Sequence, residues 1–203
     1  ALLESGNIHI HMDLIAGLPL ASMESFARSF DDVYNLGPHV LQLGFLKVLP
    51  GADMEKFSAR YGLVYMDQPP YEVLSTGCMS YKELRFLKIL EEVFDLTYNS
   101  GRFPLTLALL AERAGQGSPF AFYRALTEWY RKQGMAGLGH SAMETAEMLY
   151  AYVEENQSAL LFQVRELLRM DVLLHLPNFK PGWLMWRTEI NYEKVTAFWR
   201  HET

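Results

Sequence analysis

Cysteine is almost absent from this 203-residue chain, in which Cys78 is the only one. A single cysteine excludes an internal disulfide framework, a zinc site built on cysteines and an iron–sulfur cluster held by this chain's own thiolates alone. Disulfides belong to oxidising compartments, so their exclusion fits a reducing one. We therefore expect a cytoplasmic protein.

Long hydrophobic runs are missing as well. No apolar stretch reaches the ~20 residues that cross a bilayer, and the stretch over 41–49 is interrupted by Gln42, Gly44 and Lys47. The first residues contain neither an initiator methionine nor the basic and apolar regions of a signal peptide. We therefore expect no membrane partner and interpret the chain as a fragment of a longer protein.

Basic residues are fewer than acidic ones in this chain. The chain has 18 Lys and Arg against 24 Asp and Glu, which gives a formal net charge of −6. The basic residues are scattered, whereas proteins that bind nucleic acid concentrate Lys and Arg on one surface. Nucleic acid is therefore not an expected partner. The 50% hydrophobic content is enough for a substantial globular core.

The first third of the chain has the pattern of a strand, a helix and a second strand. Apolar and polar residues alternate over 7–18, a helix is predicted between Ser22 and Gly37, and a second strand covers about 40–49. Strand, helix and strand in so short a span form a βαβ unit, whose strands are parallel. Parallel strands need further neighbours, so we expect a larger sheet or barrel, with a third short strand near 71–76.

From about residue 80 onward the pattern becomes helical. Ser80 and Ser141 are each followed three positions later by Glu, and these capping boxes predict the starts of two helices. Further helices are expected at 104–114, 118–134, 158–175 and 192–200. The chain therefore divides into an α/β fragment over 1–78 and an all-α domain over 79–203, and we predict a predominantly helical protein overall.

One short motif resembles a known signature, the sequence DLIAGLP at 13–19. It is similar to the motif on the fifth barrel strand of radical SAM enzymes, which flanks the adenine of S-adenosylmethionine. The segment 41–51 resembles the sixth strand and the following turn in a subgroup that also carries a cobalamin-binding domain. The segments 69–74 and 98–103 are similar to the same subgroup, the relatives of the magnesium-protoporphyrin monomethyl ester oxidative cyclase, in which an uncharacterised helical domain follows the barrel.

The resemblance implies a fold and a site. Residues 1–78 would form two or three strands of a partial radical SAM barrel, and 79–203 would form the helical C-terminal domain. Ile15 and Gly17 would contact the cofactor, and Asp13 and Gln42 would line the same cavity. Strand alternation supports this site independently, because all four residues fall on the faces opposite the apolar rows.

The resemblance also implies what the chain does not hold. The CxxxCxxC loop that ligates the 4Fe–4S cluster and the cobalamin domain have no counterpart in this sequence. S-adenosylmethionine, the cluster and cobalamin would therefore be cofactors of the parent protein, an oxidoreductase or methyltransferase-like enzyme, and the fragment alone should be inactive. Its expected partners are the upstream half-barrel and cobalamin domain, or a second copy paired through a bare strand edge.

Two other functions remain open. The helical part could be an interaction or assembly module without a small-molecule site. More distantly, His9 and His11 share a strand face with Asp13, as the His-x-His pairs of metal-dependent hydrolases do. Against this, the pair lies well before the carboxyl end of its strand, where barrel active sites gather, and His39 lies at no obvious strand end.

Overall fold

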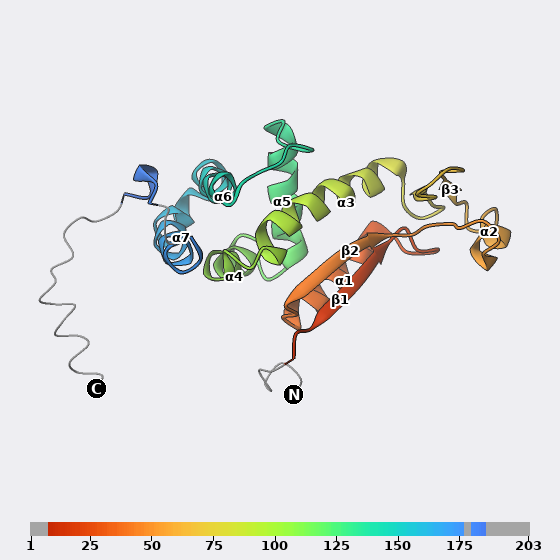
Figure 1. Ribbon diagram of the computed structural model, residues 1–203, viewed down its shortest axis with the longest axis horizontal. Helices are drawn as coiled ribbons and strands as arrows, with labels where there is room; N and C mark the ends of the chain where they lie inside the picture. Colours follow the sequence, from red (N-terminus) through yellow and green to blue (C-terminus); the bar gives the residue numbers. More distant parts are fainter. Residues whose placement is uncertain (1–7, 177–179, 186–203) are drawn as a thin grey trace, which may run out of the picture.

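Helices dominate the fold, and a small α/β unit packs against them (Figure 1). The computed structural model describes residues 8–176 and 180–185, and the statements below concern these residues. They contain seven α-helices and two sheets of two strands each. The predicted class, a small α/β part followed by helices with helix predominant overall, is confirmed.

The predicted βαβ unit is confirmed as β1 (His11–Ala16), α1 (Met23–Asn35) and β2 (Val40–Phe45). The two strands are parallel. Helix α1 begins where the Ser22 hydroxyl accepts a hydrogen bond from the Ser25 backbone N–H, which satisfies one of the free N–H groups of the first turn.

Both strands are shorter than predicted. The first ends at Ala16 because Gly17 has a φ of +81°, a left-handed conformation that a strand does not contain. The second was expected to reach Leu49, but the chain changes partner at Leu46, whose carbonyl accepts a hydrogen bond from the Val73 N–H at 2.8 Å. The pairing after residue 45 is therefore antiparallel to the segment 71–73.

The third predicted strand exists as β4 (Val73–Ser75), and it pairs with a strand that the sequence did not indicate, β3 (Val64–Tyr65). The short helix α2 (Asp53–Phe57) connects β2 to this hairpin.

The helical region follows the predicted order. The capping boxes at Ser80 and Ser141 are both present, and they begin α3 and α6. The elements are α3 (Tyr81–Phe94), the π-helical turn η2 (Asp95–Asn99), α4 (Pro104–Arg113), α5 (Pro119–Lys132), α6 (Ala142–Asn156), η3 (Ser158–Leu160), α7 (Leu161–His175) and η4 (Gly182–Leu184). The helix predicted at 192–200 lies outside the described residues.

Aromatic side chains join the α/β unit to the helices. Phe30 and Tyr34 of α1 contact Phe94 of α3 and Tyr123 of α5, with ring centres 5.3 Å apart for Phe30–Phe94. Asp31 adds a polar link, because its carboxylate accepts hydrogen bonds from the hydroxyl and backbone groups at the start of α5. The division of the chain at residue 78 stays a prediction, and the two parts share one hydrophobic core.

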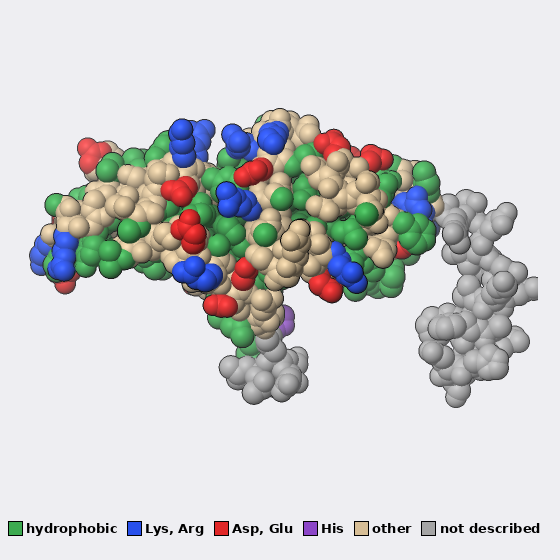
Figure 2. Space-filling model, turned by 180° about the vertical axis from the view of Figure 1, so that it is seen from behind, with side chains coloured by type: hydrophobic (Ala, Val, Ile, Leu, Met, Phe, Trp, Pro, Cys, Tyr) green, Lys and Arg blue, Asp and Glu red, His purple; other side chains and the backbone are tan. Residues whose placement is uncertain are grey.

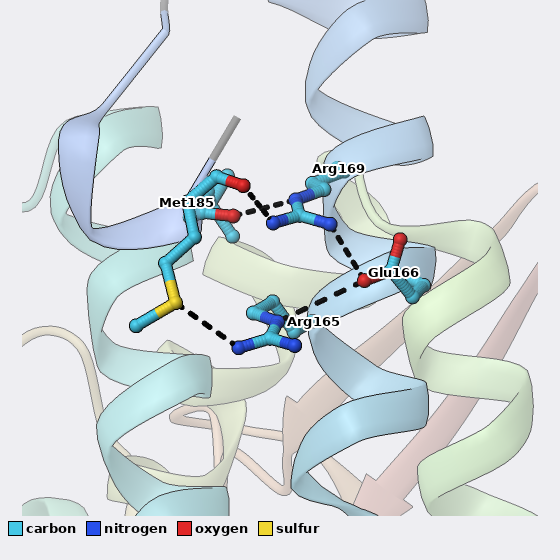
Figure 3. A network of polar contacts seen from close by, with 5 residues as sticks. Arg165, Glu166, Arg169 and Met185 are labelled. Atoms are coloured by element: carbon cyan, nitrogen blue, oxygen red, sulfur yellow. Dashed lines mark hydrogen bonds and ion pairs between the residues drawn. The ribbon is translucent and has the colours of Figure 1, made fainter. Parts of the chain in front are cut away.

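The last described residues are held against α7 (Figure 3). Arg169 donates to the Leu184 and Met185 carbonyls, and its guanidinium lies 2.6 Å from the Glu166 carboxylate. Arg165 donates to the Met185 sulfur at 3.3 Å. Leu184 is fully buried, so the segment 182–184 is part of the fold and covers one side of α7.

The surface carries no concentration of one charge on the face drawn in Figure 2, where acidic and basic side chains are interspersed. None of the described helices is long and apolar enough to cross a membrane.

Candidate functional site

The two faces of the β1–β2 sheet differ in exposure. Met12, Leu14 and Ala16 pack against the hydrophobic core, and Leu41 and Leu43 on the same side are buried. This face is therefore the covered one, as the alternation of apolar residues predicted.

The opposite face is open, and we call it the open sheet face. Its residues pair across the parallel register, Asp13 with Gln42 and Ile15 with Gly44. Asp13 and Gln42 are exposed, and 46% of the Ile15 surface is accessible. The structure thus brings three of the four predicted site residues together on one surface.

Gly17, the fourth, does not share this face. A Cβ at this position would lie 3.5 Å from the Leu84 side chain and 3.6 Å from the Val73 side chain, both of which belong to the core. Its φ of +81° also differs from that of a strand. The prediction that Gly17 lies on the same face as Ile15 is wrong, because the backbone turns at this residue, in a conformation that glycine adopts without steric cost.

A hollow of 290 Å³ follows the outer edge of β1. Asp13, Ile15 and the turn residue Leu18 line it from the sheet, and Ser25 and Ser29 line it from α1. Among the described residues β1 pairs only with β2, so its other edge is free to pair. A further parallel strand would take this place in a larger sheet.

The outer edge of β2 is closed by one side chain. The Leu41 N–H donates to Asn99 Oδ1 at 3.1 Å, and Asn99 Nδ2 donates to the Leu41 carbonyl at 3.1 Å. These are the two bonds that a residue on a neighbouring strand would make. Tyr98, the residue before, donates its hydroxyl proton to the Pro38 carbonyl. The family resemblance includes the segment 98–103, but no local pattern in the sequence predicts this contact of Asn99.

Three histidines meet at the amino ends of the two strands. The His9 ring lies 4.6 Å from that of His39 and 4.7 Å from that of His11. Desolvation, followed by the neighbouring His39 and His11 rings, lowers the pKa of His9. His39 directly precedes β2, so it lies at the amino end of a strand and not at the carboxyl end, where barrel active sites gather.

This cluster does not have the arrangement of a metal site. The Ile10 N–H donates to His39 Nδ1 at 3.0 Å, so the proton of neutral His39 belongs on Nε2 and neither nitrogen is a free ligand. Among the described residues no group of three His, Cys, Asp or Glu could hold a metal ion. The geometry therefore adds nothing in favour of a metal-dependent hydrolase.

A comparison with protein families identifies the helical region. Residues 59–203, more than half of the chain, match the model of a family described as a protein of unknown function, DUF4080. No curated protein matches the chain significantly. The match includes α3 to α7 and leaves β1 and β2 outside. The chain therefore belongs to the DUF4080 family, which is associated with cobalamin-binding and radical SAM proteins.

Proposed function

We propose that this chain is the C-terminal part of a cobalamin-dependent radical SAM enzyme related to the oxidative cyclases. Its open sheet face would form one wall of the cofactor and substrate pocket. The observation that carries the proposal is the pairing of Asp13 with Gln42 and of Ile15 with Gly44 on an exposed face, beside a strand edge that is free to pair. The association of the family with such enzymes supports it.

The residues of this face have the chemistry that an adenosyl group requires. Ile15 offers an accessible apolar side chain on which a purine ring could pack, and Gly44 beside it has no side chain to occupy that space. Asp13 accepts hydrogen bonds, and Gln42 can both donate and accept them. Gly17 would act through the shape of the turn rather than through contact with the cofactor.

The iron–sulfur cluster does not fit this chain. In radical SAM chemistry the cluster cleaves S-adenosylmethionine, and one cysteine cannot supply its ligands. The cluster and cobalamin would therefore belong to other parts of the parent protein. The helical region would close the β2 edge through Asn99 and so hold the pocket wall in place.

Cofactor affinity in the complete enzyme tests this proposal. Ile15→Asn should weaken binding of S-adenosylmethionine about tenfold, because an apolar contact is replaced by a hydrated amide. Leu138→Asn is the matched control, since Leu138 is 58% exposed in the helical region. If both variants are folded and bind the cofactor with equal affinity, the site assignment is contradicted.

A second candidate function is an assembly module. Helix α7 exposes large apolar side chains on its outer side, with 61% of Phe162 and 66% of Leu174 accessible. Exposed apolar surface of this kind is typical of protein contacts. If assembly is the function, Phe162→Gln should disrupt association while Ile15→Asn leaves it intact, and cofactor binding would be absent.

A further inference from the structure

A second hollow, of 270 Å³, lies between the β3–β4 hairpin and the first half of α3. None of the residues of the open sheet face lines it. Its apolar part is built by five side chains: Met66, Pro70, Val73, Leu74 and Leu84. Val73 and Leu84 are almost completely buried, so this part of the hollow is a fixed floor.

Two periodic patterns bring the lining residues together. Glu72 and Leu74 are two residues apart and so share one side of their extended segment. Tyr81, Arg85 and Lys88 of α3 are four and three residues apart, which places them on one side of the helix. Each of these rows lines the hollow together with the buried Val73 and Leu84.

Among the side chains that line the hollow, positive charge exceeds negative charge, with Arg85 and Lys88 against Glu72. The Lys88 ammonium lies 2.8 Å from the Glu72 carboxylate and 4.3 Å from the centre of the Phe45 ring, so these two charges neutralise each other. Lys47 faces Glu72 across an antiparallel bridge. Arg85 forms no hydrogen bond or ion pair with any described residue. The Arg85 guanidinium is therefore free to bind a ligand at the rim of the hollow.

A free guanidinium beside an apolar floor favours a ligand that has both an anionic group and an apolar part. Arg binds carboxylate and phosphate groups through two parallel hydrogen bonds. Met66, Pro70 and the half-exposed Tyr81 offer surfaces on which a flat ring can lie. Small-molecule pockets combine a mainly apolar lining with a few polar groups, and the volume of this hollow suits a small ligand.

We propose that this hollow binds a small aromatic molecule that carries a carboxylate or a phosphate. Arg85 holds the anionic group, and the ring packs on the floor beside Tyr81. None of the residues assigned to the cofactor lines this site, which is built by α3, β4 and the residues 66–72 before β4. It can therefore be tested on this chain alone.

Titration followed by NMR tests the proposal with three probes: phenylacetate, phenyl phosphate and the neutral phenylacetamide. We expect saturable shifts of the Val73, Leu74 and Leu84 methyl signals with at least one of the anions, with a dissociation constant on the order of a millimolar. The amide should bind at least about tenfold more weakly, because it cannot make the charged bonds. The stronger of the two anions identifies the preferred group.

Variants separate this site from adventitious binding. Arg85→Gln should weaken binding of the anion about tenfold or more, and Leu74→Trp should abolish it by filling the hollow. Lys82→Gln is the matched control, since it removes one positive charge from the same helix outside this hollow. Unchanged spectra elsewhere show that each variant is folded. The proposal is overturned if neither anion saturates, if the amide binds as well, or if Arg85→Gln and Lys82→Gln behave alike.

Discussion

Single polar side chains complete backbone hydrogen bonds that neighbouring elements leave open. Asn99 bonds both backbone groups of Leu41, Asp31 accepts from the start of α5, and Asp171 accepts from the backbone N–H groups of Leu105 and Thr106. Each of these bonds joins elements that are far apart in the sequence. Residues of this kind determine how elements are placed, and their loss leaves buried polar groups unpaired.

Asn99→Leu should lower the free energy of unfolding by about 1–3 kcal/mol, because the N–H and carbonyl of Leu41 lose their partners. Hydrogen exchange at the Leu41 amide should become faster. The matched control is Asn156→Leu, since among the described residues the Asn156 side chain bonds only to Tyr152, in its own helix. An unchanged exchange rate at Leu41 would show that Asn99 does not close the β2 edge.

Asp171 makes stability depend on pH. Burial raises its pKa above the ordinary 3.8, although the hydrogen bonds from Thr106 and Leu105 lower it. A carboxyl group with a raised pKa in the folded state favours folding when protonated. The stability of the wild type relative to Asp171→Asn should therefore increase as the pH falls from 7 toward 4. Denaturant unfolding at both pH values measures this difference, and a decrease would contradict the assigned direction.

At the scale of elements, the turn after β1 depends on one backbone conformation. Gly17→Ala should cost about 1 kcal/mol, since a Cβ is disfavoured at a φ of +81° although its contacts at 3.5 Å and beyond are ordinary. Gly139→Ala is the control, because nothing lies within 4 Å of a Cβ there. Urea unfolding compares the two variants. If both substitutions change the free energy of unfolding equally, the conformation at Gly17 does not disfavour a side chain.

Local signals in the sequence were sufficient to predict most elements. The capping boxes at Ser80 and Ser141 located two helices, and strand alternation assigned Asp13, Ile15 and Gln42 to one face. These features depend on residues within a few positions of one another, so a single sequence contains them.

What the sequence could not predict depends on tertiary contacts. The second strand ends early because the Leu46 carbonyl accepts a hydrogen bond from the Val73 N–H. No local pattern in the sequence predicts this change from pairing with β1 to pairing with the segment 71–73. Strand alternation alone places Gly17 on the wrong face, because it does not show that the backbone turns at this residue. The role of Asn99 could not be foreseen, since its partner Leu41 lies 58 residues away, and the family resemblance of 98–103 was the only signal.

At the scale of the whole molecule, the β1–β2 sheet has one closed edge and one free edge. Asn99 covers β2, whereas β1 has no second partner among the described residues. The outer end of the sheet, beside the hollow along β1, is therefore where another part of the parent protein or a second copy can pair.

The isolated chain should associate through this edge. Light scattering should give a mass above that of one 23.3 kDa chain, and the mass should rise with concentration. Ile15→Lys places a charge beside the edge and should reduce association, whereas Leu138→Lys should not. A mass of one chain at every concentration would rule out pairing with a second copy.

The most direct measurement of the central claim is photoaffinity labelling of the complete enzyme with an azidoadenine analogue of S-adenosylmethionine, followed by mass spectrometry of the peptides. The open sheet face should carry the label, in the peptides that contain Ile15 and Gln42, and excess S-adenosylmethionine should remove it. If the label that excess S-adenosylmethionine removes is found only in peptides without Ile15 and Gln42, the assignment of this face to the cofactor pocket is contradicted.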